Sequence, residues 1–406
     1  MKPISLALCA VIFTFFYHNS LASNSANWSK WRGPDENGIS TETNWDPEAL
    51  NEPEIKWSVK LGDGYSNVCI QDNYIYTMGN KNMKDTVFCL DFDTGEIVWK
   101  YSYEESGGFS YLGSRSTPVY SEGNLFTLSL SGKLFCFNAK TGDVIWQKNL
   151  IADYDVGTIK YSFSTSPYIY KNLIILNINK YGIALDKSNG QVVWKSEKGT
   201  CGYATPVLFS KDSKDYMAMF NYKGLYIVSP DTGKEHAFYR WENDARVSAA
   251  DPIITDKGIF ISSAYHKGGV LLKFTGKKLK KIWKSRNMMN HFSSSILIDG
   301  FLYGVSGSTH MGETELTCID IATGKKRWNS KRGIEAVTAA GDKLLSITDR
   351  GELIISKVTP EKHDVISKAK VFEKRRGDFW TAPVLCRGVV FCRNSRGTLV
   401  SVNLNR

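Results

Sequence analysis

The amino-acid sequence predicts an all-β protein, built as a closed ring of eight four-stranded antiparallel units. An aromatic residue recurs about every 45 residues along most of the chain. Pairs of short apolar runs, each joined by a tight Gly, Asn or Asp turn, recur in step with it. The two ends of the chain each hold one incomplete unit. Four-stranded units of this period are typical of an eight-bladed β-propeller, in which twisted sheets pack radially.

The repeat is clearest in a turn with the pattern small residue, x, Asp, three residues, Gly, three residues, Trp. It occurs at 89–99, 184–194 and 318–328, and at 136–146 with Asn138 in the Asp position. The glycines of these four turns are Gly95, Gly142, Gly190 and Gly324. The terminal aromatic residues follow one another at intervals of 42 to 48 residues: Trp57, Trp99, Trp146, Trp194, Phe238, Trp283, Trp328 and Phe372.

Each unit begins with two apolar runs on either side of a tight turn, as in 67–76 and 382–391. A third run, such as 86–91, leads into the Asp-containing turn, and the fourth carries the aromatic residue. Beyond the N-terminal segment, no window of 11 or more residues has helical periodicity. Every unit is therefore expected to be a four-stranded antiparallel sheet.

The chain ends indicate how the ring closes. The eighth unit has three strands, whereas segment 54–61 has an aromatic strand and no unit before it. Pairing these ends would remove an open sheet edge. We therefore expect one propeller domain over 54–406, preceded by a lead-in segment over 23–53. Two separate sandwich domains are the alternative, but they would require neither the constant period nor the split unit.

The N-terminus has the order of a secretory signal peptide. Lys2 precedes an apolar run over 4–17, and the small-residue segment 20–22 follows. We expect residues 1–22 to be removed and the mature chain, without a membrane span, to be periplasmic or extracellular. An uncleaved anchor is the alternative, although the run is short for a span.

Removal of the signal peptide would leave seven cysteines, an odd number without a CxxC pair. Three of them, Cys89, Cys136 and Cys318, occupy the small-residue position of the repeat turn. Burial as small apolar side chains is therefore expected. One or two disulfides remain open on the sequence alone.

The formal net charge of +10 is unevenly distributed. Residues 201–406 hold 33 Lys and Arg against 20 Asp and Glu, whereas residues 23–200 hold 17 against 21. The segment 273–286 has seven basic residues and no acidic one. Such lysines can protect an edge strand from aggregation, or they can meet an acidic partner, lipopolysaccharide or an acidic glycan. Export argues against nucleic acid.

The turn motif is similar to the tryptophan-docking motif of the pyrroloquinoline quinone (PQQ) repeat, with Asn189 in the Thr position of 184–194. The opening segment 28–40 also resembles the lead-in of bacterial PQQ-like repeat proteins, so the resemblance covers residues 28 to 406. It places the chain in the quinoprotein-dehydrogenase-like and BamB-like superfamily. The resemblance implies structural roles for Trp57, Trp99, Trp146, Trp194, Trp283 and Trp328, each packing on a glycine turn of the neighbouring blade.

The resemblance implies two kinds of function, because the superfamily contains both enzymes and binding proteins. Quinoprotein dehydrogenases of the alcohol type use PQQ with Ca²⁺, an adjacent cysteine pair, carboxylate and amide metal ligands, and an Asp base. The propeller subunit of the barrel-assembly machinery instead binds protein segments without a cofactor. This sequence has no adjacent cysteines and is shorter than those dehydrogenases. We expect a non-catalytic binding or scaffold protein with no cofactor or metal. The alternatives are a minimal PQQ- and calcium-dependent dehydrogenase oxidising an alcohol or sugar, and an outer-membrane assembly scaffold.

In a propeller, the residues just before the first strand of each blade surround the central funnel. Residues at or near these positions include Ala249, Ser293, Ile334, Asp251, Glu335 and Phe379. The candidates for binding a planar or anionic ligand, or a protein segment, are Tyr65, Arg115, Ser164, Tyr203, Arg246, His291 and Trp380. A solvated funnel mouth without a ligand is the alternative. Asp251 directly precedes Pro252, where a turn carboxylate is expected more readily than a catalytic base.

Overall fold

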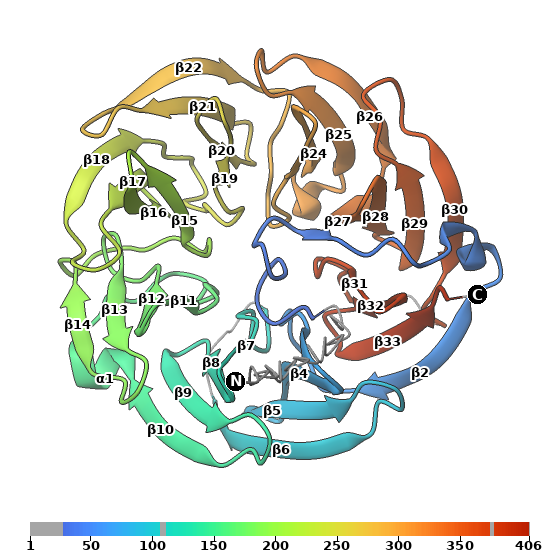
Figure 1. The fold of residues 1–406 in the computed structure, drawn as a ribbon, viewed down its shortest axis with the longest axis horizontal. Helices are drawn as coiled ribbons and strands as arrows, with labels where there is room; N and C mark the ends of the chain where they lie inside the picture. The colour runs from blue at the N-terminus through green and yellow to red at the C-terminus, as the bar shows by residue number, and fades with distance from the viewer. Residues whose placement is uncertain (1–26, 106–110, 374–376, 406) are drawn as a thin grey trace, which may run out of the picture.

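The computed structural model describes residues 27–105, 111–373 and 377–405. In this part of the chain, eight antiparallel sheets surround a central axis, as the sequence predicts (Figure 1). Each sheet is a meander, because β-branched and aromatic strands alternate with short Gly, Asn and Asp turns. The alternative of two separate sandwiches is therefore wrong.

The strands of each blade run from the centre to the rim, and blade 1 is the first complete sheet of the chain. Blades 1 to 4 consist of β3 (Cys69–Gln71), β4 (Tyr74–Lys81), β5 (Lys84–Asp91) and β6 (Ile97–Glu104); β7 (Val119–Ser121), β8 (Asn124–Leu128), β9 (Lys133–Asn138) and β10 (Val144–Asn149); β11 (Tyr168–Tyr170), β12 (Leu173–Leu176), β13 (Ile183–Asp186) and β14 (Val192–Lys195); and β15 (Val207–Lys211), β16 (Lys214–Phe220), β17 (Gly224–Val228) and β18 (Glu235–Arg240). Blades 5 to 8 consist of β19 (Ile253–Ile254), β20 (Ile259–Ser263), β21 (Gly268–Phe274) and β22 (Leu279–Ser285); β23 (Ile296–Ile298), β24 (Phe301–Ser306), β25 (Glu315–Asp320) and β26 (Lys326–Arg332); β27 (Ile334–Ala340), β28 (Lys343–Thr348), β29 (Glu352–Lys357) and β30 (Val365–Lys370); and β31 (Val384–Cys386), β32 (Val389–Arg393), β33 (Thr398–Asn403) and β2 (Glu54–Lys60).

The ring closes where the sequence predicts. Strand β2, from the start of the propeller, pairs antiparallel with β33, from its end, so that Trp57 lies opposite Ser401. Blade 8 therefore combines both ends of the domain. This pairing satisfies the backbone hydrogen bonds of an edge that would otherwise be open.

The repeat tryptophans connect successive blades. The Trp283 ring covers the turn at Gly324 (φ +67°), where an added Cβ would lie only 2.6 Å from the ring. Its Nε1 donates a hydrogen bond to the carbonyl of Ile321 at 2.8 Å. Trp57, Trp99, Trp146 and Trp194 dock in the same way on Gly95, Gly142, Gly190 and Gly233. The structural role that the resemblance implies for these residues is consistent with this geometry, because only glycine leaves room for the ring.

Trp328 departs from this pattern. It donates to the carbonyl of Thr359 at 2.8 Å and stacks on His363, with ring centroids 5.5 Å apart. Blade 7 has no glycine at this turn, and an imidazole ring takes the place of the bare backbone. Blades 6 and 7 are therefore connected by a tryptophan that packs on a histidine ring instead of on a glycine turn.

The small-residue position of the repeat also has a structural explanation. Cys89, Cys136, Ala184 and Cys318 lie directly opposite the tryptophans of their own blades. A bulky side chain there would compete with the indole for space. All seven cysteines that the structure describes are buried, and no disulfide joins any two of them, so the one or two bridges that the sequence allows are not formed among them.

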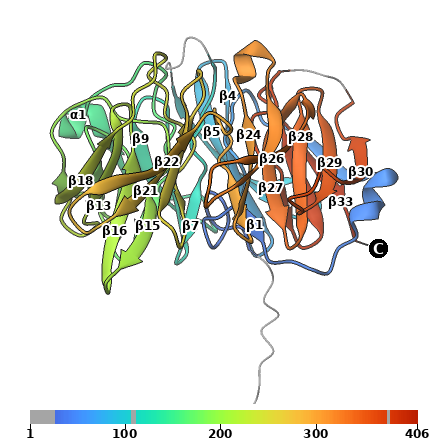
Figure 2. The same ribbon diagram turned by 90° about the horizontal axis from the view of Figure 1, so that it is seen from above.

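The lead-in segment, here called the strap (residues 27–53), crosses one face of the ring (Figures 1 and 2). Its strand β1 (Ile39–Ser40) adds in parallel to β27, and its helix η1 (Pro47–Asn51) lies against β30 at the rim. Trp28 exchanges backbone hydrogen bonds with Ile70 of blade 1. The strap therefore spans the ring from blade 1 to blade 7.

Two further short helices, α1 (Leu150–Tyr154) and η2 (Thr309–Met311), lie on the face opposite the strap (Figure 2). Within the described residues, no helix is long and apolar enough to cross a membrane. The expected signal peptide over 1–22 lies outside the described residues.

Candidate functional site

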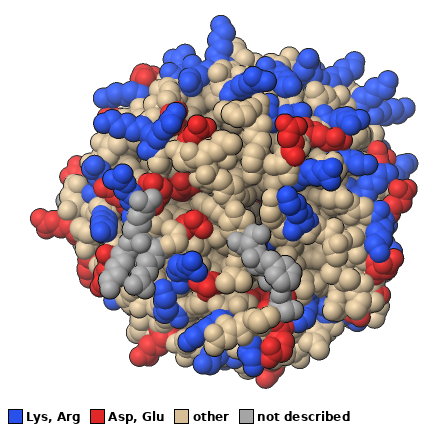
Figure 3. Space-filling view, turned by 180° about the vertical axis from the view of Figure 1, so that it is seen from behind, with Lys and Arg blue, Asp and Glu red and all other residues tan. Residues whose placement is uncertain are grey.

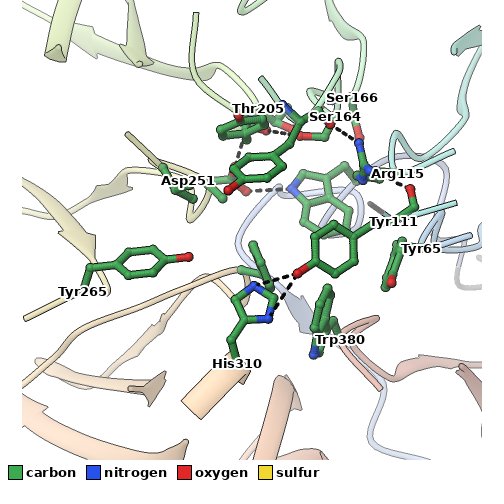
Figure 4. A pocket seen from close by; sticks show the side chains of 16 residues that line it. Tyr65, Tyr111, Arg115, Ser164, Ser166, Thr205, Asp251, Tyr265, His310 and Trp380 are labelled. Atoms are coloured by element: carbon green, nitrogen blue, oxygen red, sulfur yellow. Dashed lines mark hydrogen bonds between the residues drawn. The ribbon is translucent and has the colours of Figure 1, made fainter. Parts of the chain in front are cut away.

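A deep pocket occupies the centre of the ring on the face opposite the strap (Figure 4). It encloses about 910 Å³ of space, its open mouth included. Two kinds of loop form its wall: those before the first strand of a blade, and those between the second and third strands. Both kinds emerge on the same face because each blade is a four-stranded meander. The pocket is lined mainly by aromatic rings: Trp31, Tyr65, Tyr111, Tyr161, Tyr203, Tyr265, Phe292, His310 and Trp380.

The strap forms the floor of the pocket. The Trp31 Nε1 donates a hydrogen bond to Asp251 Oδ2 at 2.6 Å, and the backbone N–H of Thr205 donates to Asp251 Oδ1 at 2.8 Å. The Nε of Arg32 lies 4.0 Å from Asp251 Oδ2. Burial raises the pKa of Asp251 above its usual range, and the nearby Arg32 charge opposes this shift. Both carboxylate oxygens thus serve to hold the floor, which makes Asp251 a poor candidate for a general base.

Arg115 fixes one wall of the pocket. Its guanidinium donates to the backbone carbonyl of Tyr161 and, at 2.7 Å, to that of Tyr111. Burial lowers its pKa below the ordinary value. Because a guanidinium has five N–H donors, two carbonyl contacts leave donors for a ligand. Arg115 therefore positions two tyrosine-bearing loops and still presents positive charge beside the cavity.

The neighbouring part of the wall is a stack of rings around Trp380. Tyr65 lies nearly parallel to it, with centroids 5.1 Å apart, and donates its hydroxyl to Asp378 Oδ2 at 3.0 Å. Burial and the Asp378 charge raise the Tyr65 pKa, so its hydroxyl remains a donor. The Phe292 ring is tilted against that of Trp380, with centroids 4.7 Å apart. Ring pairs at these distances form a rigid surface with exposed π faces.

Tyr111 and His310 meet across the mouth. They come from loops on opposite sides of the ring, one before blade 2 and one within blade 6, and their rings stack with centroids 5.6 Å apart. The Tyr111 hydroxyl lies 3.3 Å from the His310 Nε2. This contact narrows the entrance to the pocket.

His291 supports the pocket from behind. It stacks on Phe292 at 3.6 Å, and its Nε2 shares a hydrogen bond with the Tyr265 hydroxyl at 2.8 Å. Its Nδ1 contacts the Thr309 hydroxyl at 2.7 Å. Burial, with a smaller contribution from His310, lowers the His291 pKa to about 3. The imidazole is therefore neutral at physiological pH and links two pocket rings.

The structure brings together most of the residues that the sequence nominates. Tyr65, Arg115, Ser164, Tyr203 and Trp380 line the pocket, as do Ala249 and Asp251. Ser164 donates to the carbonyl of Tyr203 at 3.2 Å. His291 lies behind the wall, and Arg246 is outside the lining, with its guanidinium over the Tyr222 ring. A ligand-binding role for any of them stays a prediction.

Sequence reasoning missed much of the aromatic lining: Trp31, Tyr111, Tyr161, Tyr265, Phe292 and His310. Tyr265 and His310 lie in loops between the second and third strands, which the meander topology places beside the funnel. Tyr111 and Tyr161 precede the nominated Arg115 and Ser164 by a few residues. Trp31 could not be identified, because nothing in the sequence around it indicates that the strap crosses the central axis.

Comparisons with known proteins agree with this architecture. The family model described as "Outer membrane protein assembly factor BamB" matches residues 83–330, more than half of the chain. An outer membrane protein assembly factor BamB from Kangiella koreensis is 29% identical over 89 residues, which cover 21% of this chain and 23% of that protein. The quinoprotein alcohol dehydrogenase PedH from Pseudomonas putida is 29% identical over 147 residues, covering 33% of this chain and 23% of that protein. Each match thus spans about a quarter of the relative's length.

Solved structures show the same fold. The crystal structure of BamB from Moraxella catarrhalis superimposes with a TM-score of 0.63 at 16% identity, covering 86% of this chain and 99% of that chain. Because identity is low, this similarity concerns the fold. The family match, the eight blades and the docking tryptophans together show that this chain is a PQQ-like β-propeller and belongs to the family of the outer membrane protein assembly factor BamB.

Proposed function

We propose that this chain is an exported propeller that binds a small ligand or a protein segment in its central pocket and does not catalyse a reaction. The observation that carries the proposal is an aromatic pocket that is open at one end and closed at the other by the strap. A concave, mostly apolar site with a few convergent polar groups is the usual form of a binding site.

The chemistry of the lining indicates what the pocket can hold. The rings of Trp380, Phe292 and Tyr111 offer faces on which a planar group can stack. The remaining N–H donors of Arg115 can pair with an anionic group beside those rings. A planar or anionic small molecule fits this arrangement, and so does a protein segment that inserts an aromatic side chain.

A ligand screen tests the proposal. Thermal-shift measurements with aromatic acids, sugars and aromatic peptides should identify stabilising ligands for the wild-type protein. The shift should disappear in Trp380→Ala and Arg115→Ala and persist in Trp283→Phe, which alters an outer docking residue. Hits that bind equally well to the two pocket variants would contradict the proposal.

A PQQ-dependent dehydrogenase is the second candidate, favoured by the similarity to the quinoprotein alcohol dehydrogenase. PQQ bound with Ca²⁺ would supply oxidation of an alcohol. The donors present do not fit this calcium chemistry. Both Asp251 oxygens are engaged in the floor, and the described residues contain no group of three His, Cys, Asp or Glu that could hold a metal.

The two candidates separate in one assay. The pure protein is incubated with PQQ and Ca²⁺, and dye-linked oxidation of alcohols and aldoses is followed. The binding proposal expects no turnover above the protein-free control. Robust turnover that is lost in Arg115→Ala or Trp380→Ala would establish the dehydrogenase instead.

The family match favours one version of the binding proposal, in which this chain takes part in outer-membrane protein assembly. In that case the occupant of the pocket or of a neighbouring surface is a segment of an assembly partner. Reconstitution with purified candidate partners tests it, since a complex that survives Trp380→Ala would place the contact outside the pocket.

A further inference from the structure

The outer strands of blades 5 and 6 form a strongly basic surface, here called the basic rim. It comprises the exposed side chains Lys280, Lys281, Lys284, Lys325, Lys326, Arg327, Lys331 and Arg332. Segment 273–286 holds seven basic residues and segment 321–333 holds five, and neither segment holds an acidic residue. Figure 3 shows Lys and Arg gathered along this upper edge of the ring.

The two basic strands are joined directly. Trp283 of β22 docks on the Gly324 turn, which immediately precedes the basic residues at the start of β26. Asn287 adds a hydrogen bond from its side chain to the Gly324 carbonyl at 2.9 Å. The same docking contact that holds adjacent blades together therefore merges two basic strips into one surface.

Little of this charge is neutralised within the chain. Arg332 lies 3.8 Å from Glu315, and Lys284 lies over the Trp241 ring at 5.3 Å. Among the described residues, no carboxylate lies within 4.0 Å of the ammonium groups of Lys280, Lys281 or Lys326. Their positive charge thus faces solvent.

Edge protection does not account for so many basic residues. The outer strands β10 and β14 are equally open, and each contains one lysine, Lys148 or Lys195. They also leave Ile145 and Val193 about half exposed. If one lysine per strand is sufficient there, the excess on β22 and β26 needs another explanation.

The shape of the basic rim limits the kind of partner. It is the convex outer edge of the ring, and its residues line none of the described pockets. Ile282, exposed by 45%, lies between Lys281 and Lys284. A convex surface of lysines around an apolar side chain can contact an extended anionic plane that has an apolar layer beneath it. It is less suited to enclosing a single small anion.

We propose that the basic rim docks this propeller, edge-on, to a bilayer surface rich in anionic phospholipid. Lysines and arginines of β22 and β26 face the headgroup phosphates, and Ile282 reaches the boundary of the acyl region. The outer strands β22 and β26 lie on the circumference of the ring (Figures 1 and 2), whereas the pocket is lined by loops around its centre (Figure 4), so docking leaves the pocket mouth accessible. The proposal is independent of what the pocket binds.

Vesicle co-sedimentation tests this proposal. Vesicles of phosphatidylcholine containing about 30% phosphatidylglycerol are compared with pure phosphatidylcholine vesicles, at sodium chloride concentrations from about 50 to about 500 mM. The rim variant is Lys280→Glu/Lys281→Glu/Lys284→Glu. The matched control, Lys100→Glu/Lys140→Glu/Lys195→Glu, reverses three exposed lysines on or beside the outer strands of blades 1 to 3. Both variants are checked by circular dichroism and thermal unfolding.

Wild-type protein should bind the anionic vesicles only, and salt should weaken this binding. The rim variant should lose roughly tenfold or more in partitioning, whereas the control should lose about threefold or less. Ile282→Ser should weaken partitioning without changing its salt dependence. Absence of binding to anionic vesicles, or equal loss in the two triple variants, would overturn the proposal. Tight binding to soluble polyglutamate without vesicle binding would also overturn it, in favour of an acidic protein partner.

Discussion

Aromatic side chains form two rings in this molecule, an outer ring of docking tryptophans and an inner ring around the pocket. The outer tryptophans lie on the next blade and donate their indole N–H groups to its backbone carbonyls at 2.8–3.1 Å. The inner rings instead contact one another, as Trp380 does with Tyr65 and Phe292, and leave faces open to the cavity.

The outer ring therefore has a structural role, whereas the inner ring is placed to contact a ligand. The outer tryptophans recur in step with the blades and, except for Trp328, pack on a glycine turn, so each performs the same task of fixing one blade to the next. The inner residues come from two kinds of loop and from the strap, and their types differ from blade to blade. A repeat fold can vary the inner ring without disturbing the outer one, and function is therefore expected where the repetition ends.

The sharpest test of this difference is truncation in each ring. Trp283→Ala should lower the free energy of unfolding by about 3–5 kcal/mol, because it removes an inter-blade contact and leaves a cavity. Trp380→Ala should lower it by about 1 kcal/mol, because the ring already faces an open pocket. Urea unfolding followed by circular dichroism measures both. Equal losses would mean that the inner ring is also architectural.

A pair of glycine substitutions isolates the docking contact itself. Gly324 and Gly300 both have positive φ, but an added Cβ would meet the Trp283 ring at 2.6 Å in the first case and nothing within 4 Å in the second. Gly300→Ala should cost about 1 kcal/mol of backbone strain. Gly324→Ala should cost about 2–4 kcal/mol, because overpacking is added. The free energies of unfolding of the two variants are measured by thermal and urea unfolding. Equal losses would mean that the contact between Trp283 and the glycine turn contributes nothing to stability.

Acid should weaken the inner ring through His291. The pKa of His291 is about 3 in the folded chain, below its ordinary value of 6.5. The unfolded chain therefore takes up the proton first, and stability that is fully present above pH 6.5 is lost as the pH falls toward 3. The loss should be about 2 kcal/mol at about pH 5.

His291→Gln supplies the comparison, because Gln remains neutral over this range. Unfolding free energies between about pH 8 and about pH 4 should fall less steeply for this variant than for the wild type. Parallel pH profiles would show that His291 is not held neutral by its contacts with Phe292, Tyr265 and Thr309.

Much of this comparison follows from sequence. Period and strand pattern follow from local sequence, and the incomplete units at the two ends of the propeller indicate ring closure. The aromatic residues predicted for the docking position of blades 4 and 7 are wrong. The strand register places Ala237 and Ser367 there, whereas Phe238 is one residue further along β18 and Phe372 lies beyond the end of β30.

The pocket is only partly predictable. The position before each first strand identifies Tyr65, Arg115 and Trp380, whereas the partners across the ring depend on three-dimensional proximity.

The strap shows the limit most clearly. Trp31 contacts Asp251, which is 220 positions away in the sequence, and only the folded ring brings the two together. No periodicity can identify a contact that occurs once. The same holds for Tyr111 and His310, which lie on opposite sides of the mouth and meet because of the ring diameter.

The most direct test of the account is ¹⁹F NMR of protein labelled with 5-fluorotryptophan, its resonances assigned through single Trp→Phe variants. The labelled protein is titrated with the ligands that the thermal-shift screen identifies. If ligands bind at the inner ring, the resonances of Trp31 and Trp380 should shift while those of the six docking tryptophans stay in place. Shifts confined to the docking tryptophans, with Trp31 and Trp380 unchanged, would contradict binding at the inner ring.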